Sequence, residues 1–259
     1  MVELIKSAHK RSLIADIIHI LFNVLYAIAV TAFVILFPTS PWAAYALVII
    51  AKWRTVAVRT RFWRSNILAN LPDTLFGLGI VTLMWVSASL SVQILLTGVY
   101  VIWLVLIKSL YKRHHVMIQA GITQFVSLAA LSSVAYLMPV WVAVLITFVI
   151  GFSVARQALG TYDEADRSFL SAVWGLVLAE MVFVFWHWTI AYQIMPGLKE
   201  SQFAIIAAAL ALIAIRCYNG WHDDNKISWK EIRTPVIFVG ILIISMLLFF
   251  SGLWDASTL

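Results

Sequence analysis

Residues 51–73 read AKWRTVAVRTRFWRSNILANLPD, and this stretch decides how the chain is placed relative to a membrane. Long apolar runs flank it on both sides, yet it carries five cations: Lys52, Arg54, Arg59, Arg61 and Arg64. Cations are too costly to leave in hydrocarbon, so we predict that the stretch lies at a membrane surface. It is also the densest group of anion-binding side chains in the chain. It is therefore the first candidate for a site that binds a phosphate or a lipid head group.

The composition of the whole chain indicates a membrane protein. Of the 259 residues, 63% are hydrophobic and 12% are charged, whereas about 25% of residues are charged in an ordinary soluble domain. The apolar runs continue for about 20 residues, the length of a transmembrane helix, and lack the alternation of barrel strands. Cys217 is the single cysteine, which excludes an internal disulfide and a cysteine-based metal cluster. We predict an all-α, polytopic transmembrane bundle in which residues 1–259 form one integral membrane domain.

Nine apolar segments are candidate membrane spans. They cover residues 13–36, 42–58, 71–86, 90–110, 116–137, 140–157, 169–192, 203–218 and 236–253. With the N-terminus inside, 17 of the 18 Lys and Arg residues fall on the inner side, and Lys199 falls outside. Because cytoplasmic loops retain positive charge, this split predicts a protein of the cytoplasmic membrane with its N-terminus inside and its C-terminus outside. The net charge of +6 is then a topology signal, so we predict membrane lipids as partners and no nucleic acid.

Polar residues on the first predicted span form one candidate catalytic site. Asp16, His19 and Asn23 are spaced three and four residues apart, which places them on one face of a helix. We expect that face to look into the bundle, where Lys52 or Arg216 is available to pair with Asp16. A carboxylate and an imidazole at this spacing handle protons or bind a metal. The alternative is a structural hydrogen-bonded patch.

The basic stretch supplies the candidate ligand-binding residues. They are Lys52, Arg54, Arg59, Arg61, Asn66 and Asn70, with Asp73 as a candidate catalytic carboxylate. Two other interpretations stay open. In the first, the cations and the neighbouring aromatic residues only orient the chain and dock it on lipid head groups. In the second, Asn70 and Asp73 only begin a helix, as N-cap and first-turn acid.

Two acidic features add further candidates. Asp163, Glu164 and Asp166 can hold Mg²⁺ and bridge it to a diphosphate, or they cap the next helix and pair with the basic stretch. Glu180 lies near the middle of the predicted span 169–192, so it is protonated, paired or lines a wet cavity, and it is a candidate catalytic residue. His187 shares its helical face, which suggests a proton relay between the two.

The predicted topology resembles that of the UbiA-type intramembrane prenyltransferases. That family holds a magnesium diphosphate with two aspartate-rich motifs, on the loops after its second and sixth helices. Here the corresponding loops offer Asn66, Asn70 and Asp73, and then Asp163 to Asp166, in an order that departs from the family's motifs. The resemblance covers the topology and no motif, and what it implies is a magnesium cofactor.

The sequence favours a protein whose inner face binds an anionic small molecule or lipid head group, as a lipid- or isoprenoid-modifying enzyme. A transporter or proton-coupled carrier is the first alternative, although no internal repeat or matched pair of broken helices supports it. A noncatalytic subunit of a membrane complex is the second. No motif for nucleotide hydrolysis or for the common hydrolases occurs.

Overall fold

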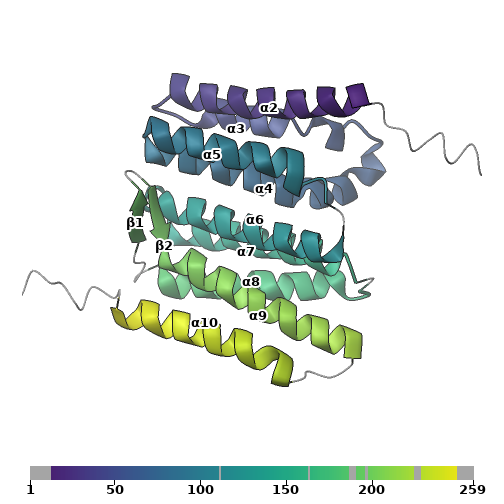
Figure 1. Cartoon of the computed structure of the whole chain (residues 1–259), viewed down its shortest axis with the longest axis vertical. Coiled ribbons are helices and arrows are strands. Elements are labelled where there is room, and N and C mark those ends of the chain that lie inside the picture. Colours follow the sequence, from purple (N-terminus) through teal and green to yellow (C-terminus); the bar gives the residue numbers. More distant parts are fainter. Residues whose placement is uncertain are drawn as a thin grey trace, which may run out of the picture.

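The computed structural model describes residues 13–110, 112–162, 164–186, 191–195, 198–224 and 229–249 of the chain. Within these ranges the protein is almost entirely helical, and its helices lie side by side in a bundle (Figure 1). The elements in chain order are α2 (Leu13–Leu36), α3 (Trp42–Ile50), η1 (Trp53–Thr55), η2 (Thr60–Phe62), α4 (Trp63–Ser87), α5 (Leu90–Ile102), η3 (Trp103–Ile107), α6 (Arg113–Ser133), η4 (Ala135–Leu137), α7 (Val140–Leu159), α8 (Arg167–Phe185), β1 (Ala191–Met195), β2 (Leu198–Ser201), α9 (Gln202–Asp224) and α10 (Trp229–Phe249).

Seven of the nine predicted spans are helices long and apolar enough to cross a membrane. They lie in residues 15–36, 60–87, 90–107, 113–133, 140–159, 167–185 and 202–222 of the described chain. Of the other two, α10 has 21 residues, within which the described apolar helix is Ile232–Met246, and α3 has nine residues. Nine residues of α-helix extend about 14 Å, roughly half of a hydrocarbon core. The prediction of nine full spans is therefore confirmed only in part.

The second predicted span is interrupted because the chain leaves the helical conformation at Ala51. Residues 51–62 form two short 3₁₀ turns, η1 and η2, instead of continuing to residue 58. The predicted helix start at Asn70 is wrong, since α4 already begins at Trp63. Asn70 lies inside α4 and donates its amide to the carbonyl of Asn66 at 2.9 Å. Pro72 is likewise an interior residue of α4.

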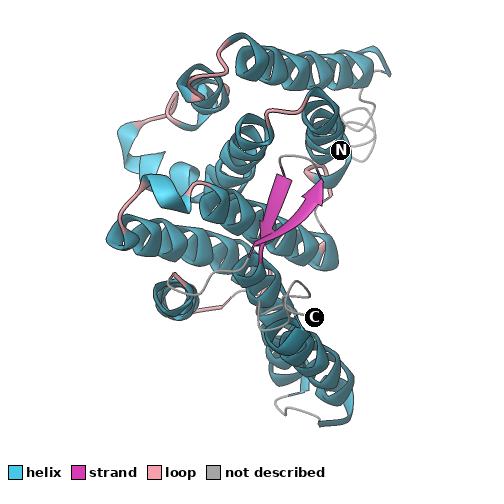
Figure 2. Ribbon diagram, turned by 90° about the vertical axis from the view of Figure 1, so that its left-hand side faces the viewer, coloured by secondary structure: helices cyan, strands magenta, loops and turns pink. Residues whose placement is uncertain are grey.

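A two-stranded hairpin replaces the last part of the predicted span 169–192. β1 and β2 pair antiparallel, with Tyr192 opposite Glu200. The hairpin lies at the opposite end of the bundle from η1 and η2 and crosses the helix ends there (Figures 1 and 2). A prediction from the spacing of apolar residues misses the hairpin, because β1 continues an apolar run. Pro196-Gly197 is nevertheless a turn signal in the sequence.

Two close helix contacts hold the bundle together. α7 packs on α8 through Gly151 and Gly175, where a Cβ built on Gly151 would lie 2.8 Å from the Cα of Gly175. Such small residues let helix backbones approach closely inside a membrane. α4 packs on α6, and its side chains Phe76, Ile80 and Met84 are almost fully buried. These contacts fix how each helix is rotated, and so decide which polar residues face inward.

Candidate functional site

The predicted basic stretch forms an exposed surface at one end of the bundle. We call residues 51–64 the basic segment and the end of the bundle at which it lies the basic end. Arg54, Arg59, Arg61 and Arg64 are all exposed. So are the three aromatic side chains of the segment, with Trp53 68% exposed, and the Arg61 guanidinium lies 4.5 Å from the ring centre of Phe62. The segment thus presents cations and aromatic rings to its surroundings.

Asp73 anchors the basic segment to the bundle. Its carboxylate is largely buried, and its Oδ2 atom accepts hydrogen bonds from the ammonium groups of Lys52 and Lys108, the latter at 2.7 Å. The indole of Trp103 donates to the other oxygen, Oδ1, at 2.9 Å. These are the ion pairs formed between described residues. One carboxylate therefore joins three parts of the chain: the basic segment, α4 and the end of η3.

The π-helical turn η3 explains why Trp103 and Lys108 reach the same carboxylate. The backbone N–H of Lys108 donates to the carbonyl of Trp103 at 2.9 Å, a bond between residues five apart. This spacing places residue 108 above residue 103, on one face of the turn. Phe76 stacks on the Trp103 indole with ring centres 3.8 Å apart. Sequence reasoning missed both residues, because nothing in the local sequence announces a π turn.

The Asp73 cluster carries two ammonium groups against one carboxylate, so its net charge is positive. Burial lowers the pKa of the Lys52 ammonium from its ordinary value, and the neighbouring Asp73 carboxylate opposes that shift. Lys108 has about half of its side chain exposed. The cluster is therefore a structural anchor that leaves positive charge at the basic end.

The structure brings the α2 candidates only partly into the bundle. His19 is exposed, while Asp16 and Asn23 are half-buried, and the Asn23 amide donates to His19 Nδ1 at 3.2 Å. Lys52, an expected partner of Asp16, is bound to Asp73 instead. The expectation that this face looks inward is therefore wrong for His19. A catalytic role for Asp16 and His19 stays a prediction without a described pocket around it.

Glu180 also lies on the outside. It is exposed on α8, in a row with the exposed side chains of Leu176 and Phe183. The packing of Gly175 and Leu178 against α7 turns Glu180 away from the interior. Glu180 does not line the cavity described below, and His187, its suggested relay partner, falls outside the described residues.

The predicted magnesium ligands are only partly described. Asp163 lies outside the described residues. Glu164 accepts a hydrogen bond from the hydroxyl of Tyr218, and Asp166 is exposed immediately before α8, without a side-chain capping bond. Within the ranges that the structure describes, no three His, Cys, Asp or Glu side chains are grouped so that they could hold a metal ion.

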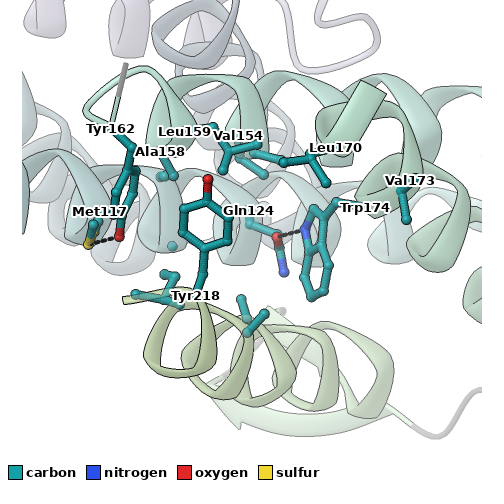
Figure 3. A pocket seen from close by; sticks show the side chains of 16 residues that line it. Met117, Gln124, Val154, Ala158, Leu159, Tyr162, Leu170, Val173, Trp174 and Tyr218 are labelled. Carbon is teal, nitrogen blue, oxygen red and sulfur yellow. Dashed lines mark hydrogen bonds between the residues drawn. The ribbon is translucent and has the colours of Figure 1, made fainter. Parts of the chain in front are cut away.

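A cavity of about 210 Å³ lies among α6, α7, α8 and α9 (Figure 3). It is lined by Met117, Ala120, Gly121, Gln124, Val154, Ala155, Ala158, Leu159, Tyr162, Leu170, Val173, Trp174, Ala211, Ala214, Ile215 and Tyr218. The amide of Gln124 donates to the carbonyl of Ala207 at 2.9 Å, and its oxygen accepts from the Trp174 indole at 2.9 Å. The inner polar groups are thus satisfied by the protein, and the walls are otherwise apolar.

Polar side chains border the cavity at the end nearest the basic end, where Tyr162 and Tyr218 line it. Tyr162 and Tyr218 stand edge to face, with ring centres 4.8 Å apart. The Arg113 guanidinium lies 3.9 Å from the Tyr162 ring centre and donates to Asn219 Oδ1 at 3.0 Å. The Tyr162 hydroxyl donates to the same amide oxygen, and the His222 ring lies 4.9 Å from the Tyr162 ring. We call Arg113, Tyr162, Tyr218, Asn219 and His222 the polar mouth.

Sequence reasoning missed this cavity because four helices contribute to it. The alanines of α9 have two different surroundings. Ala204 and Ala207 are fully buried, whereas Ala211 and Ala214 line the cavity. Their small side chains provide its volume.

Comparisons with protein families, with curated proteins and with solved structures find no match to this chain. The topological resemblance to the prenyltransferases therefore gains no support from them. The function has to be inferred from the side chains and their geometry.

Proposed function

We propose that this integral membrane protein binds an anionic lipid, whose hydrocarbon chain enters the cavity while its head group lies at the polar mouth. The observation that carries the proposal is the apolar wall of the cavity, which the polar mouth borders near the basic end. An amphipathic molecule likewise joins an apolar part to a polar one. The proposal keeps the predicted ligand class and moves the site from the basic stretch to the α6–α9 cavity.

The size of the cavity supports a hydrocarbon chain as occupant. An apolar cavity of about 150 Å³ in another protein stays dry and binds benzene. The cavity here is larger, at about 210 Å³, yet smaller than the roughly 300–1,000 Å³ of pockets that enclose drug-sized molecules. It therefore has room for a segment of a hydrocarbon chain.

The charges at the basic end support an anionic head group. Arg113 lies in the polar mouth, and five residues before it in the sequence Lys108 keeps about half of its side chain exposed. Positive charge of this kind is typical of the cytoplasmic side of a membrane protein, where it attracts anionic lipids. We therefore propose that the basic end faces the cytoplasm, in the cytoplasmic membrane.

Filling the cavity at Gly121 tests the chain site. Gly121 lines the cavity, and a Cβ added there meets no atom within 4 Å. We expect Gly121→Leu to weaken the binding of dioleoylphosphatidylglycerol about tenfold, because the leucine displaces at least two methylene groups of the chain, worth about 0.8 kcal/mol each. Native mass spectrometry of the detergent-solubilised protein, titrated with the lipid, measures the change.

Gly98→Leu is the matched control. Gly98 lies on α5, away from the cavity, and a Cβ there also meets no atom within 4 Å. It introduces the same side chain into a helix, so its affinity for the lipid should equal that of the wild type. Equal lipid affinity in the two leucine variants would show that the cavity does not hold the chain.

The basic segment should strengthen the preference for anionic lipid at the same end. We expect Arg54→Gln and Arg59→Gln each to reduce the preference for dioleoylphosphatidylglycerol over dioleoylphosphatidylcholine by about 1 kcal/mol, because each removes one exposed cation near the head groups. The same titration, run with both lipids, gives the preference. Thr60→Gln, an exposed neutral position in the same segment, serves as control. An unchanged preference in the arginine variants would leave the segment with a role in orientation alone.

A further inference from the structure

A row of polar side chains follows one face of α6 through the middle of the bundle. His115, Gln119, Thr123 and Ser127 are four residues apart, and side chains at this spacing lie one above another on a helix. Thr123 is fully buried, and Gln119 and Ser127 are nearly so. This face differs from the one that carries Gln124, which lines the lipid cavity.

α7 places a second row opposite the first. The amide of Gln157 donates to the Gln119 side-chain oxygen at 3.3 Å, which sets the register between the two helices. α6 and α7 follow each other through a short turn and run antiparallel, so Thr123 and Ser153, each four residues from this pair, lie at about the same level. Thr147 is six residues from Ser153, about 120° around α7, on the side of Gly151, which faces α8. We call the other six side chains the polar column: His115, Gln119, Thr123, Ser127, Ser153 and Gln157.

The unpartnered atoms of the described residues are concentrated in this column. Among the described residues, six buried side-chain nitrogen or oxygen atoms find no hydrogen-bond partner within the protein. Five of them belong to the column: His115 Nδ1, Thr123 Oγ1, Ser127 Oγ, Ser153 Oγ and Gln157 Oε1; the sixth is Thr147 Oγ1. Other hydroxyls in the bundle behave differently. Thr31, Thr82 and Ser133 donate to the carbonyl four residues earlier in their own helices, the usual arrangement for a helical Ser or Thr in an apolar setting.

Leaving these atoms unpaired would be costly, since each buried group without a partner forfeits its hydration. The spacing of the column offers a remedy. Successive levels of α6 are four residues apart, a rise of about 6 Å. One water molecule that makes hydrogen bonds of about 2.8–3.0 Å on both sides bridges that distance. Buried polar groups that the protein cannot satisfy are commonly paired by such waters.

We propose that the polar column binds a file of water molecules, which forms a hydrated path from the basic end into the middle of the bundle and admits protons. His115 stands at the entrance, in the first turn of α6, and its ring nitrogens both donate and accept hydrogen bonds. The path is separate from the lipid site, because none of its residues lines the cavity. It supplies the feature that a proton-coupled carrier needs.

Silver ions provide a direct test, since they enter narrow aqueous paths and bind thiols. Cys217 is the only cysteine, so a Cys217→Ser protein carries no thiol. Single variants Thr123→Cys, Ser127→Cys and Ser153→Cys are then exposed to Ag⁺, unfolded and alkylated, and the mass shift counts the thiols that remained free. We expect these three thiols to react at least about tenfold faster than thiols in dry core, where a raised thiol pKa suppresses the reactive thiolate.

The dry controls are Ala129→Cys on α6 and Ala143→Cys on α7, both fully buried and outside the column. Ala129 lies two residues from Ser127 at nearly the same depth. Reaction of the column thiols at the rate of these controls would overturn the proposal.

A second measurement needs no cysteine. Thr123→Val keeps the shape of the side chain and removes its hydroxyl. If the column is dry, the change removes an unpaired polar group, so the melting temperature rises or stays the same, which would overturn the proposal. If the column holds water, the change breaks the file and lowers the melting temperature, and Thr123→Ser restores it. Both tests are independent of lipid affinity, so they fail or succeed separately from the lipid site.

Discussion

Asp73→Ala is expected to lower the free energy of unfolding by about 3–5 kcal/mol, the largest effect of any single substitution considered for this protein. The alanine leaves the half-buried ammonium of Lys52 without a counter-charge and the Trp103 indole without its acceptor. Removing one member of a buried ion pair is far more costly than removing both, because the remaining charge stays desolvated. Thermal or denaturant unfolding of the purified protein in detergent measures the loss.

Two comparisons isolate this effect. Asp166→Ala removes an exposed carboxylate that forms no ion pair with a described residue, and should change stability by less than about 0.5 kcal/mol. Lys52→Met combined with Asp73→Ala should recover part of the loss, since the unpaired buried cation is then gone as well. If Asp73→Ala is no more harmful than Asp166→Ala, the carboxylate is not the anchor of the basic segment.

Gly151→Ala is expected to destabilise the protein by about 1–3 kcal/mol, although it adds only one methyl group. That methyl carbon would lie 2.8 Å from the Cα of Gly175 and 3.0 Å from a methyl group of Leu178. Backbone atoms cannot move aside as a flexible side chain can, so α7 and α8 must separate. The melting temperature of the purified variant reports the change.

The same substitution at Gly98 should have the opposite sign. Gly98 is an exposed helical residue with open space around its missing Cβ, and alanine there is expected to stabilise by about 0.5–1 kcal/mol through its lower conformational entropy in the unfolded chain. Equal shifts at both positions would mean that α7 and α8 do not meet backbone to backbone.

The positions of most helices could be predicted because apolar length is a local property of a sequence. The span predicted for residues 13–36 coincides with α2, and seven spans in all were found at spanning length. The interruption at Ala51 and the π turn at Trp103 could not be predicted, because both depend on where Asp73 lies in the folded chain. A carboxylate 21 residues after Lys52 and 35 residues before Lys108 gives no local signal of the pairing.

The rotation of each helix about its axis is the second feature that could not be predicted from the sequence. The sequence predicts Glu180 halfway along the span 169–192, whereas α8 ends at Phe185, and whether Glu180 faces inward depends on which face packs against α7. The Gly151–Gly175 contact makes that choice, and it turns Glu180 outward. The polar face of α6, in contrast, is visible in the sequence as the four-residue spacing of His115, Gln119, Thr123 and Ser127. The cavity is harder to predict than a polar face, since its walls come from four separate helices.

The shortness of α3 has a mechanical consequence for the surrounding bilayer. Beside this helix the apolar wall of the protein is about 14 Å high before it meets Lys52 and the exposed Arg54. A full hydrocarbon core is about 30 Å thick, and a bilayer adjusts to a shorter wall by thinning, at a cost of a fraction of a kcal/mol per Å. Lipids along α3 should therefore be compressed and tilted on one flank only. Such a one-sided deformation draws the protein toward thin or strongly curved regions of the membrane and repels it from thick ones.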